Sequence, residues 1–196
     1  MTPDNFFFTE NDLAAYAVKH YNFTTHEGFN AGIWRNDNAT DNQAATDYDK
    51  KWIPGQWKVP EAYDNPASND PWYFSAIREA NYFLETVVPR FEKGEIEGSE
   101  TNIKHYIGEM YFLRAKNYLS KLETFGDFPI IKNTLPDESV SLIQASKREP
   151  RHKVARFILE DLDLAIGLLT NTISGGKNRI TKNAALLLKS RAALYE

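Results

Sequence analysis

Residues 108–130 read Gly108-Glu-Met-Tyr-Phe-Leu-Arg-Ala-Lys-Asn-Tyr-Leu-Ser-Lys-Leu-Glu-Thr-Phe-Gly-Asp-Phe-Pro-Ile130, and they contain one helix and the turn that ends it. Apolar side chains recur here at intervals of three and four residues, which is the spacing of one helical face. Gly126 can adopt the left-handed conformation that ends many helices, and Pro129 cannot continue a helix. We therefore predict a helix over about 100–123, with Gly108 and Ala115 as small residues that let a second helix approach closely.

The same spacing predicts four more helices, over residues 9–21, 71–92, about 150–170 and from about 181 onward. Thr9 and Asp12 are placed to form a capping box at the start of the first helix. Pro71 suits the first turn of the second helix, and Pro89 is expected to distort or end it. Residues 132–149 are polar and are expected to be irregular.

Four sequence blocks occur in the order and spacing of one protein family. They resemble the SusD/RagB family, surface lipoproteins of Bacteroidetes that capture glycans for an outer-membrane transporter. The blocks are Trp72–Leu84, Gly108–Ala115 with Phe125–Pro129, Arg151–Ala165, and Arg179–Tyr195. The resemblance implies an all-α fold of irregular, tetratricopeptide-like helix pairs. It also implies that residues 1–196 are the N-terminal part of such a domain, with a loop insertion at about 22–70 and the family's C-terminal half absent.

Composition excludes several kinds of function. The chain of 196 residues has a net charge of −4, so it lacks the basic surface that nucleic acids or anionic membranes require. It contains no cysteine, which removes disulfides, thiolate metal sites and a cysteine nucleophile. The four histidines, at positions 20, 26, 105 and 152, do not form a metal-binding motif. We expect no metal, no cofactor and no nucleic-acid partner.

Residues 22–70 are rich in turn-forming residues and have no lasting periodicity. Loops of this length in compact domains are usually functional or disordered. Aromatic residues argue against disorder, because disordered segments are poor in them. Three of the chain's four tryptophans, at positions 34, 52 and 57, lie in this region. We therefore predict a folded, aromatic-rich loop.

Sugar rings have an apolar C–H face that an indole ring can cover, while neighbouring polar groups bind the hydroxyls. Trp52 and Trp57 lie among asparagine, aspartate, arginine and glutamine residues that could do this. The alternative is that both tryptophans only hold the loop against the helices. The resemblance implies that glycan contacts come from this interval before Trp72, so we predict Trp57, Trp52, Arg35 and Asp41 as ligand-binding residues.

Catalysis is a weaker interpretation of the same loop. Glycosidases need two acids across one glycosidic bond. Acidic residues are present at Asp37, Asp41, Asp47 and Asp49, but nothing in the sequence fixes their separation. There is also no Gly-x-Ser-x-Gly nucleophile elbow. We predict a binding protein and no enzyme.

The resemblance implies a glycan-binding lipoprotein on the outer face of the outer membrane that passes its ligand to a SusC-like TonB-dependent transporter. Its membrane contact would be an N-terminal lipid attached upstream of this chain. The alternative is a helical-repeat scaffold for protein–protein interaction without a sugar site. Under either interpretation, we expect Arg114 and Asp127 to be buried or half-buried polar groups that need partners, and we predict that they tie helices and turns together.

Overall fold

The computed structural model describes residues 6–21, 23, 53–56, 58, 71–172 and 178–196. Across these residues the regular structure is helical, with two isolated β-bridges and no strand. The helices are α1 (Glu10–Lys19), α3 (Ser75–Glu92), α4 (Glu100–Phe125), α5 (Ser139–Ala145), α6 (Arg151–Leu168) and α7 (Lys182–Tyr195). The predicted all-α fold is confirmed.

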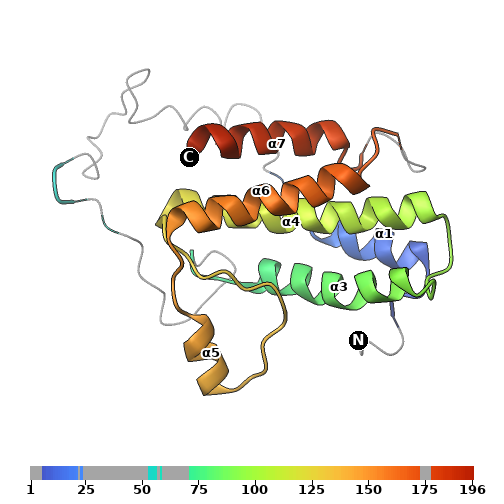
Figure 1. Ribbon diagram of the computed structural model, residues 1–196, viewed down its shortest axis with the longest axis horizontal. Helices are drawn as coiled ribbons and strands as arrows, with labels where there is room; N and C mark the ends of the chain where they lie inside the picture. The colour runs from blue at the N-terminus through green and yellow to red at the C-terminus, as the bar shows by residue number, and fades with distance from the viewer. Residues whose placement is uncertain (1–5, 22, 24–52, 57, 59–70, 173–177) are drawn as a thin grey trace, which may run out of the picture. The chain divides into compact units, whose positions relative to one another are not determined.

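Helix α4 is the centre of the helical part of the chain (Figure 1). It contacts α1, α3, α6 and α7. Its buried residues occur on every side of the helix, as expected for an element that neighbours surround. The consecutive helices α3 and α4 pack together, as do α6 and α7. These are the irregular helix pairs that the sequence predicts.

The close approach predicted at Gly108 is present. A Cβ atom placed on Gly108 would lie 3.0 Å from the Cβ of Leu168 and 3.0 Å from the Cγ of Leu169. Leu168 is the last residue of α6, and Leu169 follows it. A side chain at position 108 would therefore push α4 and α6 apart.

The helix ends follow local rules in two cases. Thr9 and Asp12 form the predicted capping box at the start of α1, with each side chain bonded to the other's backbone N–H. Gly126 ends α4 with φ of 70°, the left-handed backbone that favours glycine.

Helix α3 differs from the prediction at its start and ends at Glu92, as predicted. It begins at Ser75, so Pro71 precedes the helix and does not occupy its first turn. The aromatic residues before Ser75 pack on Phe125 and Phe128 instead of continuing the helix. Pro89 does not end the helix, which runs on to Glu92. The proline removes only its own N–H bond, and its carbonyl still accepts a hydrogen bond from the Lys93 N–H.

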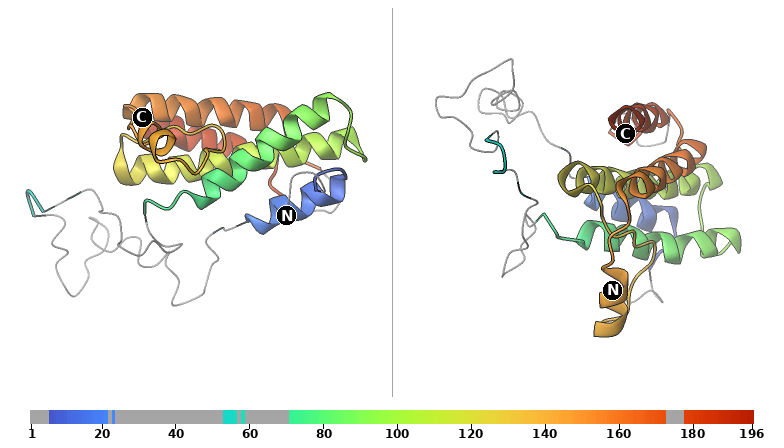
Figure 2. Two further views of the ribbon diagram at one scale, coloured as in Figure 1. Left: turned by 90° about the horizontal axis from the view of Figure 1, so that it is seen from below. Right: turned by 60° about the vertical axis from the view of Figure 1, so that its left-hand side comes forward.

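The connector between α4 and α6 was expected to be irregular, but it contains the short helix α5. None of the seven residues of α5 is buried. The helix projects away from the other helices in Figure 1 and in the right-hand view of Figure 2. Its residues lack the long apolar periodicity that reveals a helix in sequence.

Contacts divide the chain into two compact units, and the helices α1 and α3–α7 all belong to the first. The second unit spans Tyr21–Pro60, where the structure describes only Tyr21, Phe23, residues 53–56 and residue 58. Residues 53–56 form a turn in which the Gln56 N–H donates to the Ile53 carbonyl at 3.0 Å. Among the described helices, none has the length and apolar character needed to cross a membrane.

Candidate functional site

All four predicted glycan-binding residues lie outside the described residues. They are Trp57, Trp52, Arg35 and Asp41. The structure therefore does not test whether these four residues lie together. Their role stays a prediction.

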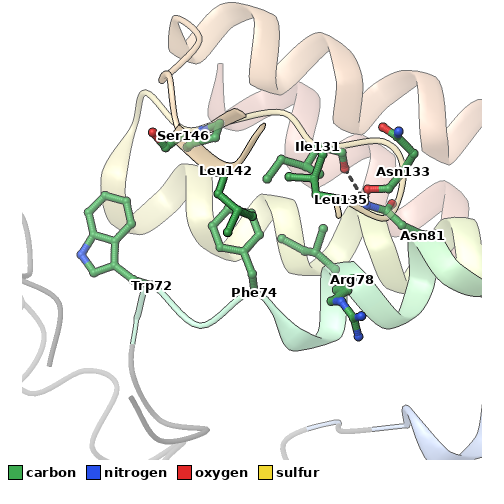
Figure 3. Close-up of a pocket in the computed structure, with 11 residues that line it drawn as sticks. Trp72, Phe74, Arg78, Asn81, Ile131, Asn133, Leu135, Leu142 and Ser146 are labelled. Atoms are coloured by element: carbon green, nitrogen blue, oxygen red, sulfur yellow. Dashed lines mark hydrogen bonds between the residues drawn. The ribbon is translucent and has the colours of Figure 1, made fainter. Parts of the chain in front are cut away.

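The described residues do form a pocket of about 350 Å³ beside the start of α3. One wall comes from Trp72, Phe74 and Ile77, and the opposite wall comes from the chain that follows Pro129. Leu142 of α5 covers one side (Figure 3). Three segments that are distant in sequence therefore meet at this pocket.

The aromatic wall is held by a cluster of rings. The Trp72 ring lies 4.0 Å from that of Phe125 between centroids, and the Phe74 ring stacks on Phe128 at 5.1 Å with an interplanar angle of 11°. The Arg148 guanidinium lies 4.8 Å from the centroid of the Trp72 ring. Trp72 is only half-buried. Its ring is a wall of the pocket because the chain before Ser75 is not helical.

The opposite wall is fixed by side chains that bind its backbone. The Asn81 amide donates to the carbonyl of Ile131 at 2.8 Å and to that of Asn133 at 3.4 Å. The Tyr118 hydroxyl donates to the Ile131 carbonyl at 3.1 Å and accepts from the Ile131 N–H at 2.8 Å. Burial raises the pKa of Tyr118 to about 12. The extended segment after the Gly-Asp-Phe-Pro turn is thus bonded to both α3 and α4.

Arg114 connects this wall to α6. Its Nε and Nη2 atoms donate to the two carboxylate oxygens of Asp161, both at 2.7 Å. Its Nη1 atom donates to Asn81 Oδ1 at 2.9 Å and to the Lys132 carbonyl at 3.3 Å. Burial raises the pKa of Asp161 above the usual aspartate range, and the Arg114 guanidinium opposes that rise. The prediction that Arg114 ties elements together is confirmed.

Asp127 has the second predicted structural role. Its Oδ1 atom accepts a hydrogen bond from the Arg151 N–H at 2.8 Å, at the first residue of α6. A carboxylate at a helix N-terminus satisfies an unpaired N–H group and complements the helix dipole. The turn after α4 therefore caps α6, which confirms the predicted tie, but Asp127 is exposed and not buried as expected, because the start of α6 that it caps lies at the surface.

A second buried polar cluster was not predicted. Arg179 binds both carboxylate oxygens of Glu109, through Nε at 2.9 Å and through Nη2. It also donates to the Ala14 carbonyl of α1 at 3.3 Å. His105, which is fully buried, accepts the Thr170 N–H on Nδ1 at 3.2 Å, and its Nε2 atom lies 3.1 Å from Glu109 Oε1. No short motif joins these residues, since Arg179 follows Glu109 by 70 positions.

These contacts define structural ties and a pocket, with no catalytic arrangement among them. Within the residues that the structure describes, no group of three histidine, cysteine or acidic side chains could hold a metal ion. The class of protein defined so far is an α-helical protein of irregular helix pairs with an aromatic-walled pocket.

The chain belongs to the SusD-like family described as starch-binding and associating with the outer membrane, whose profile matches residues 2–194. The resemblance drawn from the four sequence blocks is thus confirmed. No curated protein sequence matches the chain significantly.

Solved structures of SusD-like proteins share the fold. A SusD-like protein from Bacteroides fragilis is 31% identical, with a TM-score of 0.51, over 61% of this chain and 22% of that chain. A SusD-like carbohydrate-binding protein from the same species is 21% identical, with a TM-score of 0.50, over 60% of this chain and 22% of that chain. The match therefore spans less than a quarter of the length of these relatives.

Proposed function

We propose that this chain is part of a protein that binds an oligosaccharide or polysaccharide at the cell surface. The observation that carries the proposal is the family match over residues 2–194. In this proposal the chain supplies the N-terminal helical part of a longer binding protein, and the aromatic residues of the 22–70 region contact the sugar. The protein has no catalytic role: it binds the glycan without cleaving it.

The partner in this proposal is a SusC-like TonB-dependent transporter, which receives the glycan. The protein stands on the outer membrane through an N-terminal lipid. The family description supports the association with the outer membrane. The described helices would act as the rigid support, because buried ion pairs and hydrogen bonds connect α3, α4 and α6.

The test is isothermal titration of the chain with maltooligosaccharides, laminarin oligosaccharides and xylooligosaccharides, repeated on Trp57→Ala. We expect saturable binding of at least one sugar. The variant should bind it about tenfold or more weakly, because removing an aromatic anchor from a binding site costs about 1.4 kcal/mol or more. Tyr195→Ala is the control, since Tyr195 is an exposed aromatic residue on α7. Equal weakening by both variants would contradict the assignment of Trp57.

A second candidate function is a scaffold for protein–protein interaction. The observation that favours it is the exposed apolar face of α7, where Leu187 is 66% exposed and Leu194 is 85% exposed. The two residues are seven positions apart and so lie on one helical face. Under this alternative no sugar binds, and Leu187→Gln with Leu194→Gln abolishes binding to the purified transporter.

A further inference from the structure

Two of the polar residues that line the pocket beside α3 already use their side chains within the protein. Its buried polar residue, Asn81, already uses its amide nitrogen on two carbonyls and its amide oxygen on Arg114. The Ser146 hydroxyl donates to the Ile143 carbonyl at 2.7 Å. Sugar hydroxyls placed beside Asn81 and Ser146 would lose water and find these two side chains already bonded, which is unfavourable.

An anionic ligand is disfavoured for a related reason. Arg78 is the one charged side chain among the described residues that line the pocket. In Figure 3 its guanidinium points away from Phe74, Ile131 and Leu142. A carboxylate packed between Phe74 and Leu142 would therefore be desolvated without the Arg78 guanidinium directed at it.

The size and walls of the pocket suit a neutral aromatic group. An apolar cavity of about 150 Å³ is enough to bind benzene. The volume here is about 350 Å³, which leaves room for one ring and a short chain. Leu142 lines the pocket and is still 43% exposed, so the pocket is open on the side of α5. A ring can enter while the remainder of its molecule stays in water.

We propose that this pocket binds a neutral aromatic ester group carried on the glycan. The ring packs between Phe74 and Leu142, and the ester links it to a sugar that remains outside. This inference rests on the proposed function only for the identity of the carrier. It would make the protein select decorated glycans over bare ones.

The first test uses methyl 3-phenylpropanoate and its charged partner, 3-phenylpropanoate at pH 7, titrated into the whole chain and followed by NMR. We expect the ester to bind at least about fivefold more tightly than the acid, and Leu142→Gln to weaken the ester about fivefold through lost apolar contact. Ile143→Gln is the matched control, because Ile143 is the next residue of α5, is 70% exposed and does not line the pocket. Equal binding of ester and acid, or equal effects of the two variants, would overturn the proposal.

The second test separates the pocket from the glycan site. Maltose is compared with maltose that carries one 3-phenylpropanoyl ester. The ester is expected to bind at least about tenfold more tightly, and Leu142→Gln should remove that advantage. Equal binding of the two sugars would overturn the glycan as carrier. If methyl 3-phenylpropanoate binds but neither sugar nor any oligosaccharide does, the proposed function fails while the specificity of the pocket stands.

Discussion

The Arg114 guanidinium joins three parts of the fold. It binds Asp161 of α6, Asn81 of α3 and the Lys132 carbonyl of the segment after the turn. Arg114 and Asp161 are both buried, so neither charge has water as an alternative partner. Removing one member of such a pair leaves an uncompensated charge, whereas removing both can be nearly neutral.

We predict that Arg114→Leu lowers the free energy of unfolding by about 3–5 kcal/mol, because Asp161 is left buried and unpaired. Urea denaturation measures this change. The double variant Arg114→Leu with Asp161→Leu should be less destabilised than the single variant. The control Arg156→Leu changes an exposed arginine on α6 and should stay within about 0.5 kcal/mol of the wild type. An unchanged unfolding midpoint in Arg114→Leu would show that the pair does not hold these elements together.

Tyr118 gives a prediction about pH. Its folded-state pKa is raised by burial to about 12 from an ordinary value of 10.0. The stability that it contributes is therefore complete below pH 10 and is lost as the pH rises from about 10 to about 12. Two pKa units correspond to about 2–3 kcal/mol.

The measurement is the free energy of unfolding at several pH values between 9 and 12. Tyr118→Phe should flatten its fall above pH 10, although Tyr16, whose pKa burial also raises, keeps a share of the slope. Tyr195→Phe, an exposed tyrosine, should leave the slope as it is in the wild type. A slope that Tyr118→Phe does not change would mean that this phenol ionises freely in the folded protein.

At the scale of single residues, the sequence identifies which groups need partners but not what the partners are. A basic residue inside an apolar helix and an acidic residue in an apolar turn both indicate a structural role, as Arg114 and Asp127 show. The partner Asp161 lies 47 positions away, and nothing local singles it out. The predicted sugar contacts, such as Trp57, lie outside the described residues and stay predictions.

A comparison of Gly126 with Gly167 separates the effect of backbone conformation on stability from the effect of space for a side chain. A Cβ atom added at Gly126 or at Gly167 would meet no atom within 4 Å. Gly126 has φ of 70°, whereas Gly167 lies inside α6. Space is therefore not the difference between the two positions.

We predict opposite effects of the same substitution. Gly126→Ala should destabilise the fold by about 1–2 kcal/mol, because a residue with a side chain strains the left-handed conformation. Gly167→Ala should stabilise it by up to about 1 kcal/mol, because alanine loses less entropy in a helix. Thermal unfolding of the two variants checks both signs. Destabilisation by both would indicate that packing, and not backbone conformation, sets the cost.

At the scale of elements, periodicity found five helices but misplaced some of their ends. The start of α3 was predicted from Pro71, yet the aromatic residues before Ser75 gain more from packing on Phe125 and Phe128. That gain comes from tertiary contacts, which local rules do not include. The short α5 was missed because its seven residues bury nothing and so have no periodic face.

At the scale of the whole chain, the family could be identified from sequence, and the pocket could not. Four ordered blocks indicate the family, which the profile match over residues 2–194 shows. The pocket joins the start of α3, the segment after Pro129 and α5. None of these segments has a sequence motif that indicates a pocket. Their side chains come together only through the tertiary fold.

The helices also differ in how far each depends on the others. Helix α4 contacts four other helices, whereas α5 has no buried residue. The segments on either side of α5 are held in place through Ile131, which is bonded to α3, and Glu149, whose backbone pairs with Phe128 after α4. Backbone amides exchange with solvent when the structure around them opens, and local opening needs less energy where few contacts are lost. The two helices should therefore open independently.

We predict that hydrogen–deuterium exchange is slowest in the middle of α4, where opening requires global unfolding, and fastest among the described helices in α5. Replacing residues 139–145 by a Gly-Ser linker of equal length should change the free energy of unfolding by less than about 1 kcal/mol, because no buried side chain is removed. The same variant should bind methyl 3-phenylpropanoate at least about fivefold more weakly, because Leu142 is then absent from the pocket. A large loss of stability would mean that α5 is part of the cooperative core. Unchanged stability with unchanged ester binding would remove α5 from the site while leaving the helical bundle as described.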